Sequence, residues 1–98
     1  MIQLLTYTEP NRRLELVVWI WLDRDVLVFI IKIFKRGSSK LIQEITADGL
    51  GEVNGVLTPV ITELAVGMGI QEDQVDDFAM DCVDGVITAI KKKFDKSK

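Results

Sequence analysis

Four aspartates in the last third of the chain are the first residues whose type and spacing could do chemistry. Asp73, Asp77, Asp81 and Asp84 recur every three or four residues, a spacing that places neighbouring side chains about 5–6 Å apart on one helix face. Such a row predicts an acidic surface. It could be a solvated helix face, or it could present the charges of an inhibitor or decoy to a basic nucleic-acid-binding protein.

A divalent cation is a further chemistry that these carboxylates could support. Calcium and magnesium prefer clustered carboxylate oxygens, and the candidate ligands are Asp73, Asp76, Asp77 and Asp81. The residues between them do not have the spacing of an EF-hand loop. We therefore expect no bound metal or cofactor and keep cation binding as an alternative.

The composition argues against enzymatic chemistry. The 98-residue chain contains no histidine, which is the commonest general base and a usual zinc ligand, so no Ser-His or Cys-His pair can form. The single cysteine, Cys82, lies in an apolar helical pattern and is interpreted as a packed side chain rather than a reactive thiol. We expect a non-enzymatic protein. Because one cysteine cannot form an internal disulfide, a cytoplasmic location is also expected.

The formal net charge of −3 conceals a segregation of charge along the chain. Residues 41–90 contain ten acids and no lysine or arginine, and the basic residues lie before and after this span. Segregation on this scale creates an extended electrostatic field rather than a set of local pairs.

The elements that must position these residues are organised around the apolar segment 13–35. A membrane-spanning helix needs roughly 18 apolar residues with few charges, but charged residues interrupt the interior of this segment: Glu15, Asp23, Arg24, Asp25 and Lys32. Its valines, isoleucines and aromatic residues favour strands. We predict a β-hairpin with strands near 13–22 and 26–35, joined by the polar triplet 23–25, and no membrane span.

Both faces of the predicted hairpin are apolar. Successive strand residues point to opposite faces, so Leu14, Leu16, Val18, Ile20 and Leu22 share one face of the first strand. Glu15, Val17, Trp19 and Trp21 share the other face. In a sheet with one solvated face, every second residue would be polar. Either helices cover both faces, or a second copy or a protein partner closes one of them.

We predict an interface on the face that carries the tryptophans, formed by Val17, Trp19, Trp21, Phe29 and Ile31. If helices covered this face instead, both tryptophans would belong to the core. Stacking on single-stranded bases requires aromatic side chains interleaved with basic ones, and the acidity of the chain disfavours it. We therefore expect a homodimer or a protein partner, and no direct contact with nucleic acid.

Two further strands are predicted around the hairpin. Residues 2–8 alternate weakly and are interpreted as a first strand, followed by a turn with Pro10 at its second position. A second turn occupies residues 36–39. Residues 40–46 fit a fourth strand or a helical turn, and we favour the strand. The result is an antiparallel meander.

Two helices are predicted after the strands. The first begins at Asp48 as N-cap and ends at Gly67-Met68-Gly69. Pro59 either kinks it or starts a new helix with Thr58 as cap, and we favour the break. The second helix, 71–94, carries a continuous apolar stripe that we expect to dock on the Leu14–Leu22 face.

The sequence thus predicts a single α+β domain over residues 1–98. An antiparallel β-meander of three to four strands, about 1–46, is followed by a helical layer, about 48–94, packed on one face of the sheet. The last residues, 95–98, are expected to fray. The function expected is that of a small interaction protein that self-associates or binds a partner through an apolar sheet face.

Overall fold

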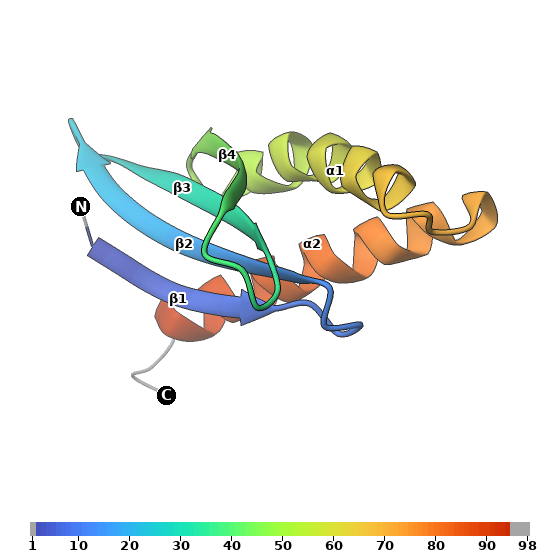
Figure 1. The fold of residues 1–98 in the computed structure, drawn as a ribbon. Coiled ribbons are helices and arrows are strands. Elements are labelled where there is room, and N and C mark those ends of the chain that lie inside the picture. Colours follow the sequence, from blue (N-terminus) through green and yellow to red (C-terminus); the bar gives the residue numbers. More distant parts are fainter. Residues whose placement is uncertain (1, 95–98) are drawn as a thin grey trace.

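The computed structural model describes residues 2–94 and confirms the predicted architecture. Four strands are followed by two helices: β1 (Ile2–Thr8), β2 (Leu14–Asp23), β3 (Val26–Lys35), β4 (Leu41–Asp48), α1 (Leu50–Gly67) and α2 (Glu72–Phe94). Both helices lie on the same side of the sheet (Figure 1). The predicted frayed tail, 95–98, lies outside the described residues.

The sheet is an antiparallel meander with strand order β1-β2-β3-β4. Each strand pairs with its neighbours in the sequence, because the short turns leave no room for a crossover. The segment predicted as a fourth strand is indeed a strand, and it extends to Asp48. Irregularities in register lie between Gln3 and Leu5 on β1 and opposite Ile33 and Phe34 on β3.

The turn between β2 and β3 is one residue shorter than the predicted triplet. Asp23 pairs with Val26, so only Arg24 and Asp25 form the loop. Both have positive φ, 51° and 72°, as the two central residues of a type I′ hairpin turn require. This turn determines the register of the hairpin and therefore which side chains of β3 lie beside those of β2.

The loop between β1 and β2 is held by a buried carboxylate. Glu9 is only 1% exposed, and its two carboxylate oxygens accept the backbone N–H groups of Asn11 and Arg13, each at 2.6 Å. The backbone carbonyl of Glu9 also accepts the N–H of Arg12 at 2.8 Å, which closes the turn predicted at Pro10. Charge-assisted bonds of this kind compensate for burying a carboxylate.

Helix α1 differs from the prediction at its start and at Pro59. Asp48 is not the N-cap of α1, because it still belongs to β4. The N-cap position is taken by Gly49, which has φ 90° and no side chain that could cap the helix. The N–H of Asp48 instead donates to the Glu52 carboxylate at 3.1 Å. The helix continues through Pro59 without the predicted break at Leu57 and without a new start capped by Thr58. Its buried side, which packs in the core on both sides of the proline, keeps the two halves together: Val53, Leu57, Ile61 and Ala65.

The end of α1 was predicted correctly. Gly69 has φ 82°, its N–H donates to the Val66 carbonyl, and the N–H of Ile70 donates to the Ala65 carbonyl, both at 3.1 Å. These two bonds define a Schellman motif, in which glycine adopts the left-handed conformation at no steric cost. The motif turns the chain directly into α2.

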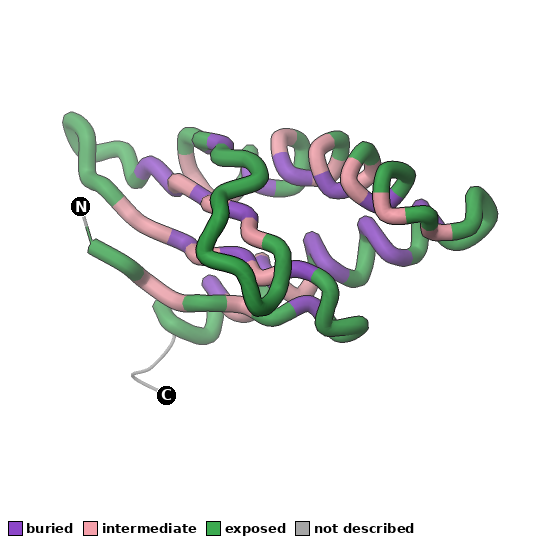
Figure 2. The backbone as a smooth tube through the Cα atoms, in the orientation of Figure 1, coloured by how far each residue is buried: buried purple, intermediate pink, exposed green. Residues whose placement is uncertain are grey.

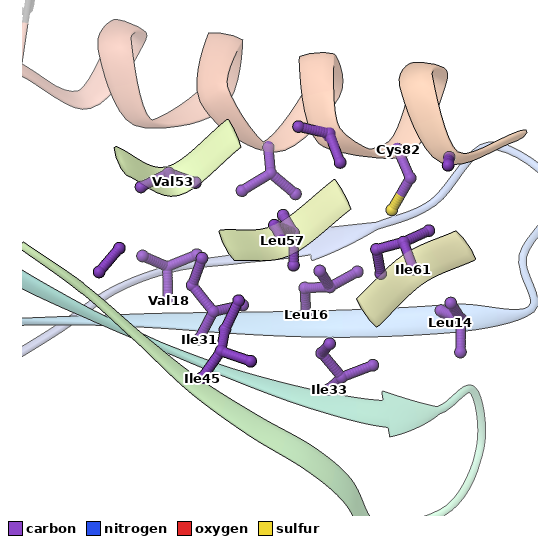
Figure 3. Packing of buried hydrophobic residues seen from close by; sticks show 14 of the residues in the cluster. Leu14, Leu16, Val18, Ile31, Ile33, Ile45, Val53, Leu57, Ile61 and Cys82 are labelled. Carbon is purple, nitrogen blue, oxygen red and sulfur yellow. The ribbon is translucent and has the colours of Figure 1, made fainter. Parts of the chain in front are cut away.

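Helix α2 carries the predicted apolar stripe. Its buried residues are Val75, Phe78, Ala79, Cys82, Val83, Val86 and Ile90. The buried segments of both helices face the sheet (Figure 2), with α2 against β1 and α1 against β4. The side chains of Leu16, Val18 and Ile31 project from the sheet into this layer (Figure 3). One core therefore joins all six elements.

Candidate interaction surface

The helices cover one face of the sheet and form the core with its side chains. The side chains of the opposite face do not belong to this core. Leu14, Leu16 and Val18 of β2 belong to the buried cluster that contains both helices. They lie on the face predicted to receive the helices. Leu22, at the end of the same alternation, is 62% exposed because it lies beyond the helical layer. The opposite face has no helix among the described residues, and we call it the open face.

An apolar cluster occupies the middle of the open face. Cross-strand pairing brings Trp19 beside Ile30 and Trp21 beside Val28, and Val17 precedes them on β2. We call these five residues the open-face cluster. Trp21 is 50% exposed, whereas Val28 is 7% exposed although it is outside the main core. Their neighbours on the outer strands are polar, with Thr46 and Asp48 on β4 paired to Ile30 and Val28.

The ammonium group of Lys32 lies over the ring of Trp19, one of the two tryptophans in the open-face cluster. The Lys32 ammonium is 5.4 Å from the centroid of the Trp19 ring, within the range of a cation–π contact. The same ammonium is 4.0 Å from the carboxylate of Glu44 on β4. The Trp19 indole Nε1 is shielded from solvent and finds no hydrogen-bond acceptor among the described residues. Trp19 is therefore a packed residue with an unsatisfied donor.

Two residues of the predicted interface do not lie on the open face. Phe29 pairs with Ile20 and Ile31 with Val18, so both point toward the helices, where they are 1% and 0% exposed. The prediction was wrong for these two residues because a three-residue loop was assumed, and a shift of one residue exchanges the two faces of a strand. Val28, Ile30 and Lys32 take their places. Only the two-residue turn of the folded hairpin identifies them, because the sequence does not distinguish it from a turn of three residues.

The hairpin tip extends the apolar surface beyond the rest of the molecule. β1 begins opposite Ile20 and β4 ends opposite Val28, so the last residues of β2 and the first residues of β3 form a two-stranded ribbon that projects from the sheet (Figure 1). Trp21, Leu22, Val26 and Leu27 are all exposed there. An isolated two-stranded ribbon is only marginally stable in water. Exposed apolar side chains that gather on such a tip are typical of a binding surface.

The predicted acidic row is exposed but is divided between two sides of α2. Asp77 and Asp81 border a hollow beside Asn11, whereas Asp84 borders a groove between α2 and α1. Asp73 lies in the first turn of the helix. None of these carboxylates forms an ion pair with another residue of 2–94.

The candidate metal ligands are not gathered into a site. Asp76 lies on the α1 side of α2, with Asp84, and Asp77 lies on the other side with Asp81. Within residues 2–94, no group of three or more carboxylate or thiol side chains is placed to hold a metal ion.

The single thiol is buried in the core. Cys82 is fully buried, and burial, with a smaller effect from the Glu9 carboxylate, raises its pKa from 9.0 to about 12. Burial also raises the pKa of Tyr7, to which Cys82, Glu9 and Asp81 add smaller effects. Since the thiolate is the reactive form, Cys82 is an unreactive packed side chain at neutral pH.

Comparison with known proteins gives no family and no relative. No family model, curated protein or solved structure matches this chain. Neither helix in the described part of the chain has the length and apolar content needed to cross a membrane.

Proposed function

We propose that this protein is a non-enzymatic interaction protein that forms a homodimer through the open face of its sheet. The observation that carries the proposal is the open-face cluster, a group of apolar side chains including two tryptophans on the face that neither helix covers. Aromatic side chains are enriched in the buried centres of protein interfaces.

The size of the open face supports a second copy as its occupant. Four strands about 4.8 Å apart and about eight residues long, at about 3.3 Å per residue, present about 500 Å². Two copies would then bury about 1,000 Å² together, which reaches the size expected of a specific interface. Packed face to face, the sheets would lie about 10 Å apart between two outer helical layers.

The charges around the cluster are compatible with contact between identical surfaces. A two-fold axis places the same residues on both sides, so one open face must be complementary to itself. The cluster is uncharged at its centre, and the charged residues on the strands around it are one base, Lys32, and three acids, Glu15, Glu44 and Asp48. A rotated second copy can bring the Lys32 of one protomer to a carboxylate of the other, and the remaining carboxylates must stay at the solvated rim of the contact.

Light scattering tests the proposal with a matched pair of substitutions. Trp21 and Leu22 are consecutive and both well exposed, 50% and 62%, but point to opposite faces. Trp21→Glu should weaken the dimer at least tenfold, because it inserts a charge into the apolar contact. Leu22→Glu adds the same charge on the other face and should leave the mass unchanged.

Measurements across protein concentration, at low and high salt, complete the experiment. An apolar interface predicts a dimer that survives high salt, and unchanged circular dichroism excludes unfolding as the cause of dissociation. A wild-type protein that remains a monomer at all concentrations would overturn the homodimer. So would a Trp21→Glu variant with the mass of the wild type.

A further inference from the structure

A basic cleft lies at the opposite end of the hairpin from the exposed tip. It encloses about 530 Å³ and lies between the Leu14–Lys35 end of β2 and β3, Ile42 of β4 and the last turn of α1. This volume is in the range of small-molecule sites. Four cationic residues line it: Arg12, Arg13, Lys35 and Arg36.

Hydrogen bonds hold the main chain at two of these residues, Arg13 and Arg36. The buried Glu9 carboxylate accepts the N–H of Arg13, and the Arg13 carbonyl accepts the N–H of Arg36 at 3.1 Å. The loop and the β3 end are thereby joined across the cleft. Since Glu9 binds backbone N–H groups rather than guanidinium groups, it orders the loop without pairing with the arginine side chains.

The positive charge of the cleft is not neutralised by its surroundings. No aspartate or glutamate is among the described residues that line it, and none of its four cations is in an ion pair with another residue of 2–94. The C-terminal end of α1 carries about half a negative charge. Its last carbonyls already accept N–H groups from Met68, Gly69 and Ile70. Four full positive charges exceed what this helix end and the nearby Glu9 carboxylate can balance together.

The wall of the cleft is aliphatic. Leu14 is buried at its base, and Leu64, Met68 and Ile42 complete the apolar lining. No aromatic ring is among the residues that line the cleft, so it offers no stacking surface for a nucleobase. We propose that this cleft binds an amphiphilic anion, a phosphate ester whose head contacts the arginines and whose short aliphatic chain lies against Leu64 and Met68.

The chemistry of the lining favours phosphate as the head group. Guanidinium groups bind phosphate oxygens in pairs, and a phosphate monoester carries close to two negative charges at neutral pH. The cluster of three arginines and a lysine can hold such a dianion. This inference does not depend on the proposed dimer, because the cleft and the open-face cluster share no residue.

Calorimetric titration with octyl phosphate below its micelle concentration tests the proposal. Wild-type protein should bind it, and the double variant Arg13→Gln, Arg36→Gln should bind at least tenfold more weakly. Inorganic phosphate lacks the chain and should also bind at least tenfold more weakly. The control is Arg24→Gln, which removes a positive charge at the other end of the hairpin and should bind octyl phosphate as the wild type does.

The outcomes separate the possible sources of the anion. Binding to octyl phosphate and to vesicles containing phosphatidic acid identifies a lipid headgroup, whereas binding to octyl phosphate alone identifies a soluble ester. No binding to octyl phosphate, equal affinity for inorganic phosphate, or an equal loss in Arg24→Gln would overturn the proposal. So would a low-salt oligomer that Arg13→Gln, Arg36→Gln abolishes, since the acidic helix of a second copy would then occupy the cleft.

Discussion

Gly85 of α2 lies directly against the ring of Tyr7 from β1. A Cβ at this position would overlap the Tyr7 hydroxyl and ring, whereas a Cβ at Gly55 of α1 would meet nothing within 4 Å. Glycine therefore has a different structural role at each of these two helix positions. One permits close contact between a helix and a strand, and the other only weakens a helix.

Replacing each glycine by alanine should separate these roles. Gly55→Ala should raise the free energy of unfolding by about 0.5–1 kcal/mol, the difference in helix propensity. Gly85→Ala should lower it by about 1–3 kcal/mol, the usual effect of overpacking. Urea unfolding of both variants provides the measurement. An equal gain for both would show that Tyr7 moves aside without loss.

The burial of Glu9 could not be predicted from the sequence. Glu9 follows a strand and precedes a proline, which is an ordinary exposed position in a turn. Its burial depends on backbone N–H groups that converge only when the loop has folded. The packed state of Cys82, in contrast, was predictable because it lies within a regular apolar stripe.

The hairpin turn is the element that decides which residues reach the open face. Arg24 and Asp25 both adopt positive φ, which costs most residues about 1–2 kcal/mol and glycine almost nothing. Asparagine and glycine are preferred at these positions. The native turn therefore keeps the register with residues that are not optimal for it.

A variant with Arg24→Asn and Asp25→Gly should be more stable than the wild type by about 1–2 kcal/mol. The physical reason is the relief of left-handed strain at the turn. The denaturant midpoint should rise with no change in the slope of the transition. Arg36→Asn, in a turn where this residue does not have positive φ, serves as the control and should not raise the midpoint.

The order and type of the six elements were predictable, whereas the turn and the start of α1 were not. A long segment with regular apolar periodicity, such as α2, can be recognised as a helix from the sequence. Composition does not distinguish a hairpin loop of two residues from one of three. The difference of one residue decides whether Phe29 and Ile31 or Val28 and Ile30 lie on the open face. Pro59 was misread because tertiary packing of Leu57 and Ile61 outweighs the local cost of proline in a helix.

At the scale of the whole molecule, the buried thiol couples stability to pH. The pKa of Cys82 is about 12 in the folded protein and 9.0 ordinarily, so above about pH 9 the unfolded chain loses a proton that the folded chain keeps. Ionisation then stabilises the unfolded state. Below the ordinary pKa neither state ionises, and this effect is absent.

The free energy of unfolding should therefore fall by about 1.4 kcal/mol between about pH 8 and about pH 10 through Cys82 alone. Other groups titrate in this range, so the measurement is the difference from Cys82→Ala, which retains all of them. Urea unfolding at both pH values provides it. Identical pH dependence in the two proteins would contradict the prediction.

The open-face cluster and the basic cleft differ in how far the sequence reveals them. Two apolar faces on one hairpin already indicate that something must cover the second face. The cleft joins two turns and a helix end that are distant in the chain. Only the folded arrangement brings them together.

The contacts among the elements also bear on how the chain folds. Each element packs against the next along the chain, and α2, the last, returns to β1, the first. Most of the fold can thus form from local contacts, which favours rapid folding. The contact between α2 and β1 closes the ring. During synthesis, the apolar side of β1 has to wait for α2 to leave the ribosome, and in that interval the growing chain is most exposed to aggregation.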